Sequence, residues 1–161
     1  MKLQSVNSQI EYLEMRLRAD QLSFIAAANN ELNEIVAGSL SSIRKSLAQE
    51  YLTSAGVEEA IAQTEDLIMP VIRNLRENIE FKVSGLEMGD VLQLLSGADG
   101  AAIPIEMVEN LFNQLAGYAA GSPIAWRHAV APEQVAVALV VLREVMHHAN
   151  YRSVSFLPVS G

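Results

Sequence analysis

Two adjacent histidines, His147 and His148, lie near the carboxyl end of the chain, shortly after Glu144. Glu144 and His147 are three positions apart, so a helix would place both side chains on one face, as the Glu-x-x-His pairs of ferritin-like diiron bundles do. A diiron centre needs a second such pair, and the chain has none. We therefore expect no metal and no cofactor, and retain Glu144, His147 and His148 as the candidate ligands if a metal binds.

The same histidines have a structural interpretation at the end of a helix. They follow the apolar run VAVALVVL. Cationic side chains in a last turn interact favourably with the free carbonyl groups and the negative end of the helix dipole. Asn150 comes next and is a natural helix terminator. This interpretation explains why the histidines stand where the apolar run stops, so we favour it over the metal site.

No residue pattern in the chain matches a catalytic constellation. Cysteine is absent, which excludes disulfides, thiolate zinc sites and cysteine nucleophiles. The glycine-rich segment from Gly85 to Pro104 contains neither the P-loop pattern nor the dinucleotide-binding pattern. The serines form no nucleophile elbow, and no Ser-His-Asp triad can be assembled. We therefore predict that the protein is not an enzyme.

The carboxyl-terminal segment YRSVSFLPVSG alternates polar and apolar residues, as a short strand does. A single strand leaves its backbone unpaired, so it needs the edge of a sheet in this chain or in a neighbouring one. A tryptophan beside an arginine in the segment IAWRHAV is a second candidate contact, since both residue types are frequent in interface hot spots. The predicted partner-binding residues are Trp126, Tyr151, Val154, Phe156, Leu157 and Val159.

The amino-terminal part of the chain is expected to be helical. Between residues 4 and 37, apolar residues recur at spacings of three, four and seven, with one gap at Asp20 and Gln21. This spacing is typical of a long amphipathic helix. The same pattern continues over residues 40–51 after a glycine, so we expect a second helix there, either separate or joined to the first across a kink.

Further helices are expected downstream. Apolar spacing predicts a helix from Val57 to Ile79, which Pro70 should kink or break near Ile68 and Met69. The segment EFKVSG, which follows, is either the fraying end of this helix or a short strand. The remaining helices are expected at about residues 87–95, from Pro104 to the segment GYAAGSP, and at residues 132–149.

These elements predict an all-α protein. We expect a multi-helix bundle of about five to six helices, with a kinked long N-terminal helical region and a short extended C-terminal tail. Half of the 161 residues are hydrophobic, which suffices for one core. We expect a single helical domain over residues 1–161, a subdomain boundary near Gly85 and a docking tail over residues 151–161. The helix at 132–149 lacks a polar face, so it belongs in the middle of the bundle or in an oligomer interface.

The chain is acidic, with a formal net charge of −8. This charge disfavours binding to a nucleic acid backbone. The first 20 residues are charged and contain no continuous apolar core, so they do not match a secretory signal. The longest apolar run is interrupted by Glu133 and Arg143 and is too short to span a bilayer. We expect a cytoplasmic or virion protein that binds neither specific nucleic acid sequences nor membranes.

Taken together, the observations favour a non-enzymatic structural or adaptor subunit of a larger assembly. Such a subunit would bind itself, as a homo-oligomer, and other protein subunits. A virion neck or head–tail connector component is the concrete form of this hypothesis, because a small helical body with a strand-forming tail suits a ring subunit. One alternative is a ferritin-like metal-binding bundle or enzyme that uses Glu144 and His147. A second alternative is a helical chaperone or regulator that binds a partner protein between its two halves.

Overall fold

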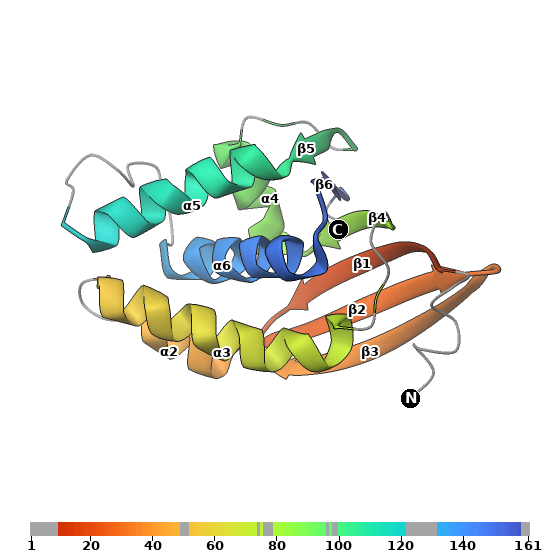
Figure 1. The fold of residues 1–161 in the computed structure, drawn as a ribbon, viewed down its shortest axis with the longest axis horizontal. Helices are drawn as coiled ribbons and strands as arrows, with labels where there is room; N and C mark the ends of the chain where they lie inside the picture. The colour runs from red at the N-terminus through yellow and green to blue at the C-terminus, as the bar shows by residue number, and fades with distance from the viewer. Residues whose placement is uncertain are drawn as a thin grey trace.

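The computed structural model describes residues 10–48, 52–73, 75, 79–95, 97, 100–121 and 132–158. The chain forms an α/β fold, in which the described strands make one mixed sheet and the described helices gather on one face of it (Figure 1). The predicted all-α bundle is therefore wrong. The error lies mainly in residues 10–39, which form three strands in place of a long helix.

The sheet has the strand order β3-β2-β1-β4-β6-β5. β1 is antiparallel to β2 and parallel to β4, β4 is parallel to β6, and the two edge strands β3 and β5 are antiparallel to their neighbours. The described elements are β1 (Ile10–Arg18), β2 (Gln21–Ala28), β3 (Glu31–Ser39), α2 (Ser41–Leu47), α3 (Ser54–Ile72), β4 (Glu80–Ser84), α4 (Leu86–Leu94), β5 (Ala102–Pro104), α5 (Ile105–Ala119), α6 (Pro132–Ala149) and β6 (Ser153–Phe156).

The first three strands form because two tight turns divide the apolar pattern. In β1 the buried residues Leu13, Met15 and Leu17 recur at every second position, which is the period of a strand. Asn29 and Asn30 join β2 to β3, and both have positive φ, at 52° and 65°. Two consecutive residues of this kind make the hairpin turn that suits the twist of antiparallel strands. The long helix is therefore replaced by a three-stranded meander.

The helix α3 passes through Pro70 and ends two residues later, at Ile72. Its amino end is capped by Thr53, whose Oγ1 accepts a hydrogen bond from the backbone N–H of Gly56 at 2.9 Å. The helix does not break at Ile68, and it is shorter than predicted. The segment EFKVSG that follows contains the strand β4, which is one of the two structures expected for it.

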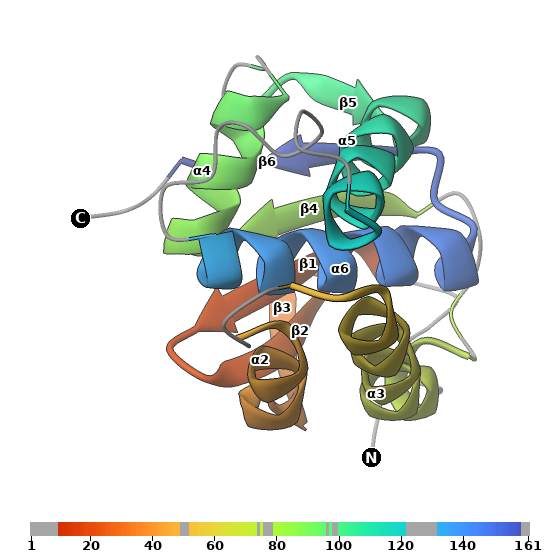
Figure 2. The ribbon, with the colours of Figure 1, turned by 90° about the vertical axis from the view of Figure 1, so that its left-hand side faces the viewer.

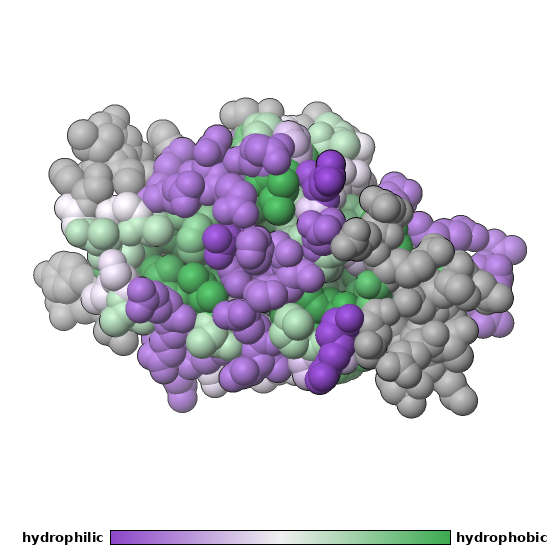
Figure 3. Space-filling model, viewed as in Figure 1, coloured by the Kyte–Doolittle hydropathy of each residue, from purple (hydrophilic) through white to green (hydrophobic). Residues whose placement is uncertain are grey.

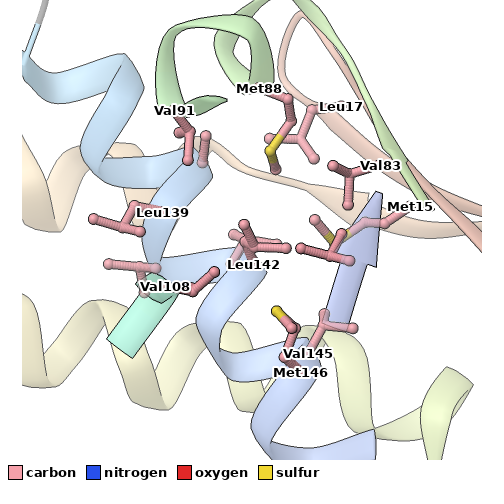
Figure 4. Packing of buried hydrophobic residues seen from close by; sticks show 14 of the residues in the cluster. Met15, Leu17, Val83, Met88, Val91, Val108, Leu139, Leu142, Val145 and Met146 are labelled. Atoms are coloured by element: carbon pink, nitrogen blue, oxygen red, sulfur yellow. The ribbon is translucent and has the colours of Figure 1, made fainter. Parts of the chain in front are cut away.

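The helix α6 is the centre of the core, although its lack of a polar face was equally compatible with an oligomer interface. It lies between α3 and α5 (Figures 1 and 2), and its residues from Val135 to Leu142 are all buried. Side chains from β1, β4, α4 and α5 converge on it (Figure 4). The helix ends as predicted at Asn150, which has a φ of 61° and allows the N–H of Tyr151 to bond the carbonyl of Met146 at 2.9 Å.

None of the described helices is both long enough and apolar enough to cross a membrane.

Candidate functional site

A cleft of about 580 Å³ opens where β1 and β4 end, at the carboxyl edge of these parallel strands. It is lined by residues of β1 and its turn, by residues 84–87 at the junction of β4 and α4, and by Leu157 and Pro158 after β6. Its volume falls in the range of small-molecule sites, which is about 300–1,000 Å³.

The cleft forms because the chain leaves β1 and β4 in different directions. β1 turns back into the antiparallel β2, whereas β4 continues into α4. Ligands of open α/β sheets bind at such divergence points, beyond the carboxyl ends of the strands. Gly85 allows the turn after β4 to approach β1 closely. Its φ is +128°, and a Cβ at this position would lie 2.6 Å from the carbonyl oxygen of Leu17.

A buried carboxylate organises one wall of the cleft. Only 6% of Glu14 is exposed. Its Oε2 accepts a hydrogen bond from Nε of Arg16 at 3.0 Å and another from Oγ of Ser84 at 2.5 Å. Arg16 and Ser84 are direct neighbours across β1 and β4, so the three side chains share one face of the sheet. Glu14 therefore holds the guanidinium and the hydroxyl in fixed positions.

Arg18 and the amino end of α4 complete the cleft. Arg18 is exposed and forms no ion pair with another described residue. No described side chain caps α4, whose first residues Leu86 and Glu87 line the cleft. Guanidinium groups and free backbone N–H groups at a helix start both bind anions, and phosphate in particular. The carboxylate of Glu87 offsets part of this positive potential.

These residues were not predicted as a site, because the apolar spacing of residues 4–37 indicated a helix. On a helix Arg16 would point away from Glu14 and Arg18, whereas on a strand positions two apart share a face. The signal was their alternation with Met15 and Leu17, which are buried on the opposite face. That alternation predicts a strand with a charged side.

The predicted metal ligands lie elsewhere, between α3 and α6. Glu144 is buried, and its Oε1 lies 3.4 Å from Nε2 of His148. The same His148 nitrogen lies 3.1 Å from Oε2 of Glu65, a residue that the sequence analysis did not name. His147 is exposed and does not belong to this cluster. The structure therefore groups Glu144 with His148 and with Glu65.

Arg143 holds the other oxygen of Glu144. Its Nη1 donates a hydrogen bond to Oε2 of Glu144 at 2.6 Å, and its guanidinium lies over the Phe112 ring, 4.5 Å from the centroid. Burial by itself lowers the pKa of Arg143, but the hydrogen bond to Glu144 and the charges of Glu144 and Glu109 outweigh burial and raise that pKa. Arg143 therefore stays charged and keeps this oxygen paired.

The predicted strand in the tail is present as β6, and it pairs with β4 and β5 of the same chain. Tyr151, Val154 and Phe156 are buried in the core, and the Tyr151 ring stacks on Phe81 with the centroids 4.8 Å apart. Leu157 is partly exposed and lines the cleft. Within one chain, the tail therefore completes the sheet.

Trp126 and Val159 lie outside the described residues, and their predicted contacts with a partner stay predictions. Self-association also stays a prediction, but its main reason has gone, because α6 is covered within the chain. On the face of the molecule shown in Figure 3, the exposed hydrophobic residues of the described part form several small, separate patches.

The fold is similar to solved structures of Ppx/GppA phosphatases. A PPX-GPPA enzyme from Aquifex aeolicus aligns with a TM-score of 0.74 at 7% identity over 98% of this chain. An exopolyphosphatase from Cytophaga hutchinsonii aligns with a TM-score of 0.67 at 11% identity, also over 98% of this chain. Both alignments cover 57% of the other protein, so this chain spans little more than half of its length. No protein-family model and no curated protein matches the sequence.

At these identities the similarity establishes the fold alone, and that fold is found in enzymes. The prediction of a non-enzymatic structural or adaptor subunit, with a virion connector as its concrete form, was therefore wrong. The ferritin-like bundle and the helical chaperone fail because both required an all-α architecture.

Proposed function

We propose that the protein binds the phosphate groups of a phosphoanhydride, of the class of inorganic polyphosphate, in the cleft at the ends of β1 and β4, and that it acts as a phosphatase-type enzyme. The observation that carries this proposal is the position of Arg16 and Arg18 on one face of β1, next to the uncapped start of α4. Guanidinium groups match phosphate oxygens in a bidentate geometry, and helix starts add backbone donors.

Each wall of the cleft has a role in this proposal. Arg16 binds one phosphate group, and Glu14 fixes the direction of its guanidinium through the bond at 3.0 Å. Arg18, which is exposed, would contact the next phosphate group of the same ligand. Ser84 donates its hydroxyl proton to Glu14 and so supports that carboxylate, and the first N–H groups of α4 would face the ligand.

The architecture supports the proposal independently of the side chains. The similar structures include exopolyphosphatases, whose name states that they act on polyphosphate. The net charge of −8 does not oppose an anionic ligand here. Charges at the protein surface are screened beyond about 8–10 Å at physiological salt, so the two arginines dominate the potential close to them.

The direct test is calorimetric titration of the purified chain with pyrophosphate and with short-chain polyphosphate. Arg16→Gln should weaken binding by about tenfold or more, because it removes a charge-assisted hydrogen bond from a partly buried site. Arg18→Gln should weaken it by about threefold, since an exposed ion pair contributes less than 1 kcal/mol. Phosphate release from polyphosphate is the second readout. It is measured separately from binding because this chain spans only 57% of the similar enzymes.

Arg152→Gln is the matched control. Arg152 is also an exposed arginine, but it precedes β6 and so lies at the amino edge of the parallel strands, away from the cleft. Its replacement should leave the affinity unchanged. The proposal fails if the unaltered chain binds neither probe, or if Arg152→Gln weakens binding as much as Arg16→Gln does.

A further inference from the structure

Three potential metal ligands converge between α3 and α6, on the helical side of the sheet. They are Glu65, Glu144 and His148, and one ligand atom from each lies within 4.8 Å of the other two. The Nε2 atom of His148 is 3.1 Å from Glu65 and 3.4 Å from Glu144. This cluster is separate from the cleft, none of whose lining residues it contains.

We propose that Glu65, Glu144 and His148 bind one divalent transition-metal ion of the zinc class. Zinc binds imidazole nitrogen and carboxylate oxygen at about 2.0–2.2 Å, which places neighbouring ligand atoms of a tetrahedral site about 3.4 Å apart. The two distances from His148 already match this separation. An imidazole among the ligands favours zinc over magnesium or calcium, which prefer oxygen alone.

Neighbouring residues fit the roles that such a site requires. Arg143 holds Oε2 of Glu144 at 2.6 Å, so Oε1 is presented to the cluster. Outer contacts of this kind orient metal-binding carboxylates. The side chains of His148 and Glu65 are 25% and 40% exposed, so the site opens to solvent on one side. A water molecule would supply the fourth ligand.

The metal would link two helices that pack against each other. Glu65 belongs to α3, and Glu144 and His148 belong to α6. An ion bound by both helices stabilises the folded state, because the unfolded chain does not hold these ligands together.

The test is zinc binding by the full chain after treatment with a chelator. Calorimetry should give one zinc ion per chain. A zinc concentration near one hundred times the dissociation constant should raise the Tm by about 5–10 °C, whereas magnesium should not change it. Cobalt, as a spectroscopic probe, should give the visible absorption of a four-coordinate site.

The chain provides a matched pair of histidines for the control. His148→Gln should abolish the zinc-dependent rise in Tm, whereas His147→Gln, which alters the exposed neighbour, should keep it. Glu65→Gln is the second test variant, because Glu65 is partly exposed and its replacement should leave the fold intact by circular dichroism. The proposal is overturned if zinc does not raise the Tm of the unaltered chain, or if His147→Gln loses the effect as fully as His148→Gln.

Discussion

Gly85 is the position where a single added methyl group should damage the fold and the cleft together. Its backbone has a φ of 128° and a ψ of 155°, a region that is almost restricted to glycine. A Cβ there would lie 2.6 Å from the carbonyl oxygen of Leu17 and 3.3 Å from its Cβ. Both obstacles are backbone or β-carbon atoms, which cannot move aside as the end of a flexible side chain can.

The expected magnitude follows from these two effects. The backbone conformation costs about 1–3 kcal/mol for a residue other than glycine, and the steric overlap costs about 1–3 kcal/mol more. Gly85→Ala should therefore lower the free energy of unfolding by about 2–6 kcal/mol. With a urea m-value of about 2 kcal/mol/M, the midpoint should fall by about 1–3 M.

The assay is urea unfolding followed by circular dichroism, with Gly100→Ala as the control. Gly100 also has a positive φ, at 79°, but no atom of the described residues lies within 4 Å of its added Cβ. That variant should lose only about 1–2 kcal/mol, the cost of the left-handed backbone. Equal midpoints for the two variants would refute the close approach of the β4–α4 turn to β1. Where Gly85→Ala still folds, its affinity for pyrophosphate should also fall, because the start of α4 is displaced.

Two further substitutions test the hairpin and the buried tyrosine. Asn30→Val should lower the free energy of unfolding by about 1–2 kcal/mol, because valine disfavours the φ of 65°. Asn30→Gly should keep the stability of the unaltered chain. A valine variant of unchanged stability in thermal unfolding would contradict the turn. Tyr151→Phe should be neutral or stabilising by about 1 kcal/mol, since the buried hydroxyl has no described hydrogen-bond partner. Burial raises the pKa of Tyr151 above its ordinary value of 10.0, so the tyrosine deprotonates first in the unfolded state. The folded state therefore keeps its full stability below pH 10 and loses stability as the pH rises above 10. Urea titrations at pH 8 and pH 11 should show a smaller loss in the phenylalanine variant, and equal losses would exclude this cause.

The second half of the chain was predictable from the sequence because its helices carry clear start and stop signals. Pro104 directly precedes α5, and Pro132 begins α6. Asn150 ends α6 in the left-handed conformation. The strand β6 was predictable from its alternation, although the sequence left open whether it pairs in this chain or in another. Local signals of this kind depend on backbone chemistry that is independent of the tertiary fold.

The first half was not predictable in the same way. The segment LSFIAAA, which forms β2, has helix-forming alanines, yet both of its faces are buried. A strand buried on both sides shows no alternation, so the sequence pattern cannot distinguish it from part of a helix. Tertiary context decides here, because β2 lies between β1 and β3. The gap at Asp20 and Gln21 was the visible sign of the first turn.

The missed strand also explains why the candidate site was missed. On β1 the side chains that build the core and those that build the cleft alternate along the same few residues. Met15 and Leu17 point into the core, as Figure 4 shows, and the intervening Arg16 lies on the opposite face with Glu14. If the segment is assigned to a helix, the core residues and the cleft residues are no longer separated onto two faces, and neither the core nor the site can be predicted. A strand reading separates them at once, so in this chain the correct period along β1 determines the fold and the site together.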